Sequence, residues 1–206
     1  MNEAFYALEE GKQRAVFNAA MEVFSRWEYK RASTDLIAAK AGVSKGLLFY
    51  YFHNKRALYL ETFAYAQRLV SEFIRDACPV QSDGFFDRLA GASREKMRLM
   101  DQSPFLLDFC VRAYYSSGEE ISDALRQKIG GELGGLYSTW FAGVDTSRFR
   151  PGADPAHILN MIAWMTDGYI HVRRMEGKPL DMEEMMAEVE RWMQMFREWS
   201  YKEEKR

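Results

Sequence analysis

Cysteine is almost absent from this sequence, which holds only Cys78 and Cys110 among its 206 residues. Two such distant cysteines form no disulfide framework and no CxxC pair, and they are typical of apolar positions in a reducing compartment. No apolar run reaches the roughly 18 to 20 residues that cross a bilayer. The first residues, MNEAFYALEEGKQR, lack a basic segment followed by an apolar one, so they do not predict a signal peptide. We therefore expect a cytoplasmic protein with no membrane partner.

The patterns of common catalytic sites are also missing. The three histidines, His53, His157 and His171, form no HxxxH or HExxH pair for a metal ion. No G-x-S-x-G motif and no glycine-rich phosphate loop occurs. Adjacent acids such as Glu119 and Glu120 would point apart on a helix, which indicates solvated surface. We expect no enzyme, no catalytic residue, no metal site and no cofactor.

The net charge of −2 conceals an uneven distribution. Residues 11–57 hold nine lysines and arginines against three acids, a net charge of +6, so the rest of the chain carries −8. A basic N-terminal quarter on an acidic body favours a polyanionic partner for one end of the molecule. A solvated basic face with no partner is the alternative, and charge alone does not decide between the two.

Strand patterns are nearly absent, whereas apolar residues recur with the 3.6-residue period of helices almost throughout the chain. Turn-forming stretches such as SDG, SSG and EGKP separate these periodic segments. The sequence therefore predicts an all-α fold of about nine helices, over residues 12–26, 33–41, 44–52, 55–76, 84–100, 104–115, 119–141, 155–175 and 181–203.

Two short predicted helices are joined only by the tripeptide GVS. Ser33 and Thr34 can cap the first helix, Gly42 ends it, and Ser44 can cap the second. A glycine at a tight reversal between two short helices is typical of a helix-turn-helix. The second helix contains the unbroken row LLFYYF, and a helix this short cannot bury such a row on every side.

The two faces of this second helix have different expected partners. At about 100° per residue, Leu48 and Phe52 point together toward a core, whereas Gly46, Leu47 and Tyr50 point away from it. The outer face can enter a major groove, where a leucine touches a thymine methyl and a lysine at position 45 reaches a guanine edge or a phosphate. A packed helical hairpin with no DNA contact is the alternative. It explains the inner pair of residues, but it does not explain the expected exposure of Leu47, Tyr50 and Tyr51 beside a surface of +6.

At these residues the sequence resembles the N-terminal domain of tetracycline-repressor (TetR) family transcriptional regulators. The resemblance covers about residues 12–60 and rests on AVFNAAMEVF, STDLIAAKAGVSKGLLFYYF and the following N-K-x-x-L order. It implies a helix-turn-helix DNA-binding domain over 1–54 and a helical ligand-binding and dimerisation domain over 55–206. Together with the cap at Ser44, the family's DNA contacts fall on Ser33, Thr34, Lys45, Gly46, Leu47, Phe49, Tyr50, Tyr51 and Lys55.

Three positions depart from the family pattern. Phe49 stands where many members have tyrosine, Asp35 where some have a basic residue, and His53 where proline or lysine is frequent. These differences leave the operator sequence open.

Two apolar stripes on the predicted C-terminal helix indicate two partners, its own core and a second molecule. The helix over 155–175 adds further apolar residues, and its Gly168 permits close helix approach. We expect a homodimer built by these two helices, which also suits a palindromic operator because two recognition helices must lie one duplex turn apart. The predicted interface residues are Met161, Met165, Gly168, Met185, Trp192, Phe196 and Trp199.

Aromatic and sulfur-containing side chains are dense in the middle helices, with polar groups among them. A buried polar group needs a partner, and a small lipophilic or aromatic effector can provide one. Most aromatic residues at helical spacing are simply core, and Asp167 and His171 are close enough to pair with each other. The candidate pocket residues are Met97, Met100, Phe105, Phe109, Tyr114, Tyr137, Trp140, Trp164, Asp167 and His171.

The sequence thus predicts a DNA-binding transcriptional regulator, a repressor that a small ligand releases from a palindromic operator. Two other classes stay open. One is a ligand-independent or architectural DNA-binding protein, which a C-terminal domain without a cavity would favour. The other is a helical small-molecule-binding protein or enzyme in which the helix-turn-helix is only structural.

Overall fold

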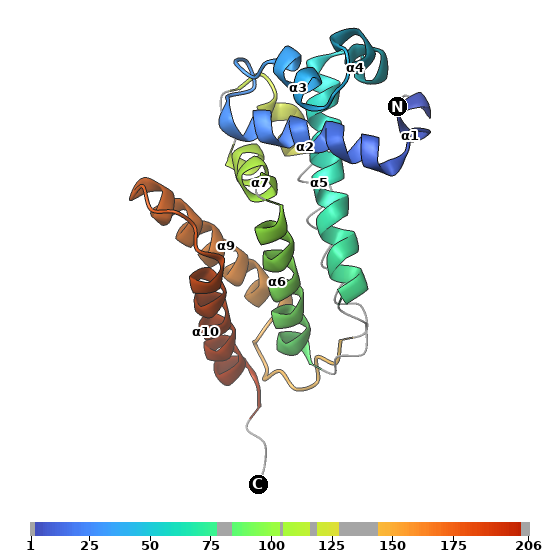
Figure 1. Cartoon of the computed structure of the whole chain (residues 1–206). Coiled ribbons are helices and arrows are strands. Elements are labelled where there is room, and N and C mark those ends of the chain that lie inside the picture. Colours follow the sequence, from blue (N-terminus) through green and yellow to red (C-terminus); the bar gives the residue numbers. More distant parts are fainter. Residues whose placement is uncertain (1–2, 78–83, 104, 116–118, 128–143, 203–206) are drawn as a thin grey trace. The chain divides into compact units, whose positions relative to one another are not determined.

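The computed structural model describes the whole chain except residues 1–2, 78–83, 104, 116–118, 128–143 and 203–206. Nine labelled helices, a further helical segment over residues 122–127 and no strand lie within the described residues, in agreement with the all-α fold that the sequence predicts (Figure 1). The chain divides into two compact units, and the first consists of Met1–Glu72 with Gln102–Gly134. The second consists of Phe73–Asp101 with Gly135–Arg206. No helix of the described part is both long and apolar enough to cross a membrane.

The helices of the first unit surround an aromatic core. Phe24 of α2 (Glu10–Arg26) lies 4.6 Å from Tyr59 of α5 (Lys55–Ala77), measured between ring centroids. Phe109 of α7 (Leu106–Tyr115) lies 5.3 Å from the same tyrosine. These three side chains are almost fully buried, and the burial raises the pKa of the Tyr59 hydroxyl. In Figure 1, α2 lies across the beginning of α5. The described helices of this unit are α1 (Glu3–Tyr6), α2 (Glu10–Arg26), α3 (Thr34–Lys40), α4 (Lys45–Phe52), most of α5 (Lys55–Ala77) and α7 (Leu106–Tyr115).

The second unit contains α6 (Phe85–Gln102, up to Asp101) and a hairpin of α9 (Pro155–Met175) and α10 (Met182–Ser200). Ile158, Ile162 and Ile170 of α9 are buried, and Met185, Val189 and Met193 are the buried methionine and valine residues of α10. The turn between the two helices reverses at Gly177, whose φ of 66° favours glycine. An ion pair of 2.8 Å between Arg173 and Glu184 also joins α9 to α10.

Most helix boundaries agree with the local signals in the sequence. Ser33, Ser44 and Asp154 each cap a helix by accepting a hydrogen bond from a backbone N–H in its first turn. Pro155 occupies the first position of α9, where a missing N–H costs nothing. Two differences stand out: α2 begins at Glu10, and the sequence did not predict α1. Of the predicted helix over 119–141, residues 122–127 are helical, and those from 128 on lie outside the described residues.

Candidate nucleic-acid interface

The turn between α3 and α4 is held by its own backbone, and a serine caps the start of each of the two helices. The Val43 N–H donates to the Ala38 carbonyl over 3.0 Å, and Gly42 has a φ of 69° at the reversal. The Ser33 hydroxyl accepts from the Leu36 N–H, and the Ser44 hydroxyl accepts from the Leu47 N–H. The two short helices are therefore fixed relative to each other by local contacts, as a helix-turn-helix requires.

The cap at Ser44 gives a direct stability test. Ser44→Ala leaves one N–H of the first turn of α4 without its side-chain acceptor, so the free energy of unfolding should fall by about 1 kcal/mol. Urea unfolding followed by circular dichroism measures the change. Ser44→Asp keeps an acceptor at the same place and should retain most of the stability. Equal losses in the two variants would contradict a capping role.

Helix α4 presents the two faces that its sequence predicts. Leu48 and Phe52 are 1% and 4% exposed, and they face the core of the first unit. On the other side, Leu47 is 38% exposed and Tyr50 is 60% exposed. A Cβ placed on Gly46 would meet no atom within 4 Å, so the backbone is open there. A large apolar and an aromatic side chain thus project into solvent from this short helix.

The expectation that Tyr51 is exposed beside Tyr50 is wrong. Tyr51 is only 9% exposed, and its ring lies 5.4 Å from the ring of Phe5, edge-on. The cause is α1, which reaches back to α4 and covers this side of it. Phe49 is half-buried, so the exposed face of α4 is narrower than the sequence indicates.

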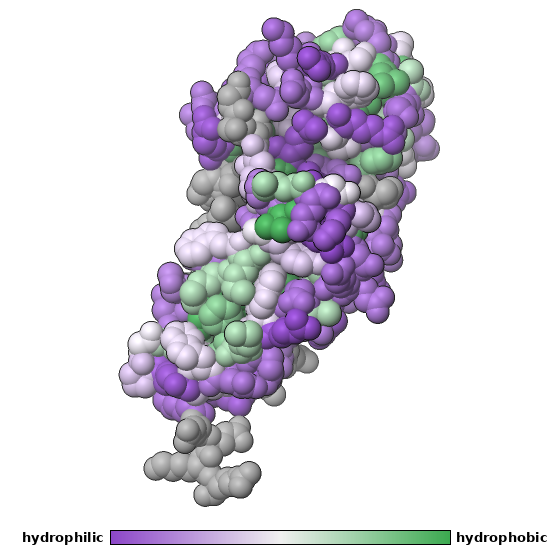
Figure 2. Space-filling model, turned by 90° about the vertical axis from the view of Figure 1, so that its left-hand side faces the viewer, coloured by the Kyte–Doolittle hydropathy of each residue, from purple (hydrophilic) through white to green (hydrophobic). Residues whose placement is uncertain are grey.

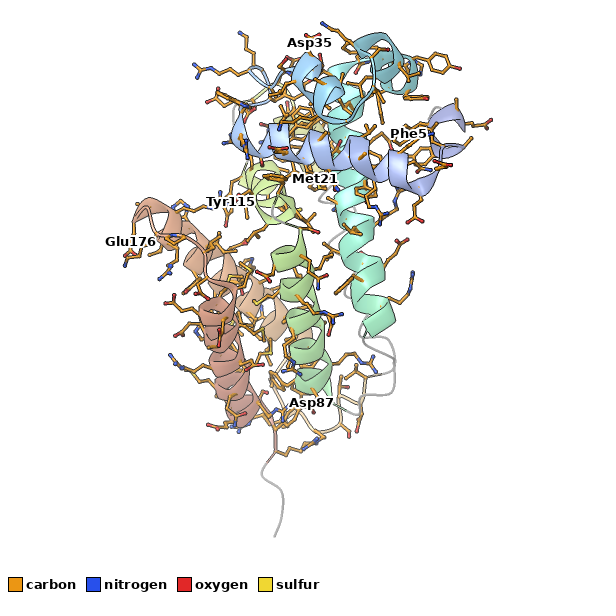
Figure 3. The ribbon with its side chains drawn as sticks, viewed as in Figure 1. Phe5, Met21, Asp35, Asp87, Tyr115 and Glu176 are labelled. Atoms are coloured by element: carbon orange, nitrogen blue, oxygen red, sulfur yellow. The ribbon has the colours of Figure 1, made fainter. Side chains whose placement is uncertain are left out.

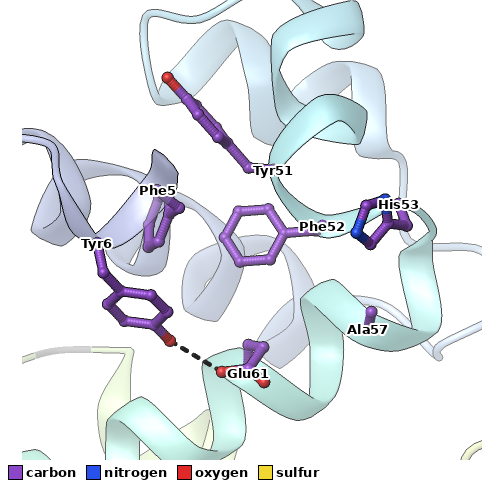
Figure 4. Close-up of a pocket in the computed structure, with 7 residues that line it drawn as sticks. All are labelled: Phe5, Tyr6, Tyr51, Phe52, His53, Ala57 and Glu61. Carbon is purple, nitrogen blue, oxygen red and sulfur yellow. Dashed lines mark hydrogen bonds between the residues drawn. The ribbon is translucent and has the colours of Figure 1, made fainter. Parts of the chain in front are cut away.

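Helix α1 fastens the N-terminus to α4 and α5 (Figure 4). The Phe5 ring packs at 4.7 Å from Phe52, and the Tyr6 hydroxyl donates to the Glu61 carboxylate over 2.9 Å. Together with Tyr51, His53 and Ala57 these side chains line a small hollow of about 80 Å³. Burial and this hydrogen bond to a carboxylate both raise the pKa of Tyr6. Sequence reasoning missed this contact, and the pair of aromatic residues in EAFYALEE was the available signal.

The two lysines among the predicted DNA contacts, Lys45 and Lys55, already interact with other groups of the protein. The Lys45 ammonium lies 2.9 Å from the Asp35 carboxylate. The Lys55 ammonium donates to the Lys30 carbonyl over 3.1 Å and lies 4.8 Å from the centre of the Tyr29 ring. Partial burial lowers the pKa of Lys55, although the negative charge of Glu120 acts in the opposite direction. A phosphate at either lysine would therefore replace an existing contact.

Helix α7 and Glu119 contact the C-terminal end of α2 and the segment that follows it. The Arg112 guanidinium donates from Nε to the Ser25 carbonyl over 2.9 Å. The Glu119 carboxylate accepts from the Tyr29 N–H over 2.7 Å, in the segment that leads to α3. Residues beyond position 100 thus support the helix-turn-helix from within its own compact unit.

The predicted pocket residues are not brought together in one described hollow. Phe109 is buried in the first unit and Met97 and Met100 in the second, while Phe105 lies beneath the Arg26 guanidinium. The expectation of buried polar groups is wrong for Asp167 and His171, because both lie on the exposed side of α9. Exposed aromatic residues among the candidates are Tyr114 and Trp164, and Tyr137 and Trp140 lie outside the described residues.

The predicted dimer residues divide between the core and the surface of the second unit. Met185 is 2% exposed and belongs to the core of its own unit, so its assignment to the interface is wrong. Met161, Trp192 and Phe196 are half-buried, and Gly168 is exposed with open space around it. We call the exposed apolar residues of α9 the α9 face, and they are Trp164, Met165, Val172 and Met175. On α10, Met195 and Trp199 are also exposed.

The α9 face is largely exposed to solvent in this unit. Trp164 is 61% exposed and Met175 is 76% exposed. Figure 2, which looks at the α9 and α10 side of this unit, shows hydrophobic residues gathered between hydrophilic ones. Such a patch on a folded protein commonly marks an interaction surface.

Comparisons with known proteins agree with this geometry. Residues 16–62 match the model of a family described as bacterial regulatory proteins, tetR family. The HTH-type transcriptional regulator RutR of Escherichia coli strain K12 is 28% identical over 171 residues, which covers 77% of this chain and 73% of RutR.

Solved structures share the fold over most of their length. The fatty acid degradation regulator FadR from Bacillus halodurans superposes with a TM-score of 0.71 at 20% identity, covering 87% of this chain and 96% of FadR. FadR from Bacillus subtilis, solved in complex with stearoyl-CoA, gives a TM-score of 0.67 at 18% identity with the same coverage.

Proposed function

This chain belongs to the tetR family of bacterial regulatory proteins, and from this membership we propose that it is a transcriptional repressor that a small lipophilic or aromatic ligand releases from a palindromic operator. The observation that carries the DNA-binding part is the outer face of α4. Leu47 and Tyr50 project into solvent beside Lys45, from a helix whose opposite face is buried. An exposed apolar face of this kind within a region of net charge +6 suits the major groove of DNA.

The proposed DNA contacts follow from the position of each residue. Leu47 and Gly46 lie against base edges, and the Tyr50 hydroxyl reaches sugar and phosphate. Of Tyr51, only the hydroxyl end takes part, because its ring is held by Phe5. Lys45 reaches a guanine edge or a phosphate. The remaining proposed contacts are to the DNA backbone or position the helices, and they come from Ser33, Thr34, Ser44, Phe49 and Lys55.

By function we assign DNA binding to residues 1–54 and ligand binding with dimerisation to residues 55–206. A protein with this task works in the cytoplasm, where it meets bacterial DNA. Two recognition helices must meet successive major grooves, so the repressor acts as a homodimer. The α9 face, with Gly168, Trp192, Phe196 and Trp199, supports a dimer formed by α9 and α10 of two copies.

Trp164→Glu tests the dimer. A charge at Trp164, the tryptophan of the α9 face, should raise the dimer dissociation constant at least about 30-fold, because central aromatic residues contribute about 2 kcal/mol or more to such interfaces. Sedimentation equilibrium measures the constant. Trp27→Glu is the matched control, since Trp27 is 49% exposed in the other unit, and it should leave the dimer intact. An unchanged constant for Trp164→Glu would place the interface elsewhere.

The effector part of the proposal is supported by the fold that this chain shares with the stearoyl-CoA complex of Bacillus subtilis FadR. A ligand that alters the spacing of the two recognition helices prevents both from entering the operator. A coupling of about 1–3 kcal/mol would change operator affinity about 5- to 150-fold.

Selection from a random-sequence duplex pool at two salt concentrations tests the function. Enrichment of an inverted repeat, with an affinity that falls steeply with salt, is the expected result. Salt-dependent binding without enrichment would favour the ligand-independent or architectural class. Absence of binding at both concentrations would reject the proposal. The enriched repeat then serves to screen lipophilic and aromatic compounds for release.

A further inference from the structure

An ion pair joins the two helices of the helix-turn-helix on their outer side. The Asp35 carboxylate of α3 and the Lys45 ammonium of α4 lie 2.9 Å apart, and their side chains are 66% and 53% exposed. Figure 3 labels Asp35 on the outer side of α3. The pair is thus accessible to any molecule that approaches Leu47 and Tyr50, which are exposed on the same helix as Lys45.

Stability of the protein does not explain this pair. Ion pairs between exposed side chains contribute little to folding. Lys45 also stands in the first turn of α4, where a cation is unfavourable because it faces the positive end of the helix dipole. Asp35 in turn places a negative charge on a surface that otherwise attracts phosphates. A carboxylate there weakens the general attraction of this surface to DNA. Its presence therefore favours a contact that only some base sequences provide.

We infer that Asp35 and Lys45 act as one unit that reads a single G·C base pair in the major groove. The inference rests on the proposed function and adds Asp35 to the base-reading residues. Guanine O6 accepts and cytosine N4 donates, and these two atoms are themselves joined by a Watson–Crick hydrogen bond of about 2.9 Å. The two oppositely charged atoms of the ion pair have the same spacing of 2.9 Å. Lysine can therefore donate to O6 while aspartate accepts from N4, without separation of the pair.

The order of groups along the groove selects G·C over the other pairs. Beside guanine O6 lies N7, a second acceptor for the same ammonium, and the cytosine amino group comes next. At an A·T pair the donor, adenine N6, lies between two acceptors, adenine N7 and thymine O4. The Asp35 carboxylate at N6 would then lie close to the acceptor N7. The Lys45 ammonium would meet O4 beside the thymine methyl group. A wrong base pair therefore leaves one of the two charges poorly matched.

Selection with matched variants tests this inference. Wild-type protein should enrich an inverted repeat with one G·C pair fixed in each half-site. Asp35→Ala should reduce the preference at that one base pair about 5- to 150-fold and leave the others in place. Asp35→Asn keeps the shape of the side chain and presents an amide, which also suits adenine N6 and N7, so it should admit A·T at that position. Glu9→Gln, which breaks the exposed pair of Glu9 with Lys12, is the control and should match wild type.

The outcomes separate the inference from the proposed function. A wild-type repeat whose base preferences stay identical in both Asp35 variants would overturn the inference alone. A uniform rise in affinity for all sequences in Asp35→Ala would also overturn it, because Asp35 would then only repel phosphate. Wild-type protein that enriches no repeat would overturn the proposed function and the inference together. Thermal unfolding of each variant shows whether a loss of preference comes with a folded protein.

Discussion

Replacing Lys45 and Tyr50 together with alanine should weaken operator binding at least about 30-fold, or about 2 kcal/mol, while the fold is retained. Both side chains project from the outer face of α4 and neither belongs to the core. Removing them takes away one cation and one aromatic contact with the DNA. The free energy of unfolding should change by less than about 0.5 kcal/mol for each exposed site.

Fluorescence anisotropy with the selected operator measures the loss, and urea unfolding measures the stability. Lys178→Ala with Tyr115→Ala is a matched control, since it removes the same residue types from exposed positions outside α4. The control should bind the operator like wild type. An unaffected operator affinity in the Lys45 and Tyr50 variant would show that the outer face of α4 is not the reading surface.

The largest expected loss of stability comes from Phe5→Ala. Phe5 is 1% exposed, and its ring lies 5.2 Å from Phe17 and 4.7 Å from Phe52. Truncating a buried phenylalanine to alanine costs about 3–5 kcal/mol, because the apolar contacts are lost and a cavity remains. We expect a decrease of that size in the free energy of unfolding, measured with urea. Operator affinity should also fall, because Phe5 supports Tyr51 and Phe52 of the recognition helix.

Two companion variants identify the cause. Phe5→Leu keeps most of the buried volume and should lose less than about 1.5 kcal/mol. Tyr6→Phe removes only the hydroxyl that donates to Glu61, and it should cost about 1 kcal/mol. A Phe5→Ala protein with wild-type stability would mean that α1 is not packed against α4 in solution.

The helix-turn-helix could be predicted from the sequence because its signals are local. Ser33, Gly42 and Ser44 each act within a few residues of their own position, and the direction of Leu48 and Phe52 follows from helical geometry alone. Such features depend on the nearby chain and not on the rest of the fold. The structure therefore agrees with the sequence here almost residue by residue.

The errors concern contacts between residues far apart in the sequence. The burial of Tyr51 depends on Phe5, which lies in a helix of only four residues that periodicity cannot detect. Helical spacing gave α10 two apolar stripes, but it could not tell which stripe faces α9, so Met185 was assigned to the wrong side. The pocket residues were grouped by composition, and composition carries no information on where helices pack.

The interleaved course of the chain restricts how this regulator can be recombined. The compact unit that contains the helix-turn-helix also needs Gln102–Gly134, and Arg112 and Glu119 hold the end of α2 from that second segment. A fragment cut after residue 54 would lack both Tyr59 and Phe109, whose rings pack near Phe24. To exchange operator specificity between relatives, it is therefore better to graft surface residues of α3 and α4. Joining a whole N-terminal fragment to the remaining chain of another regulator would remove these supporting contacts.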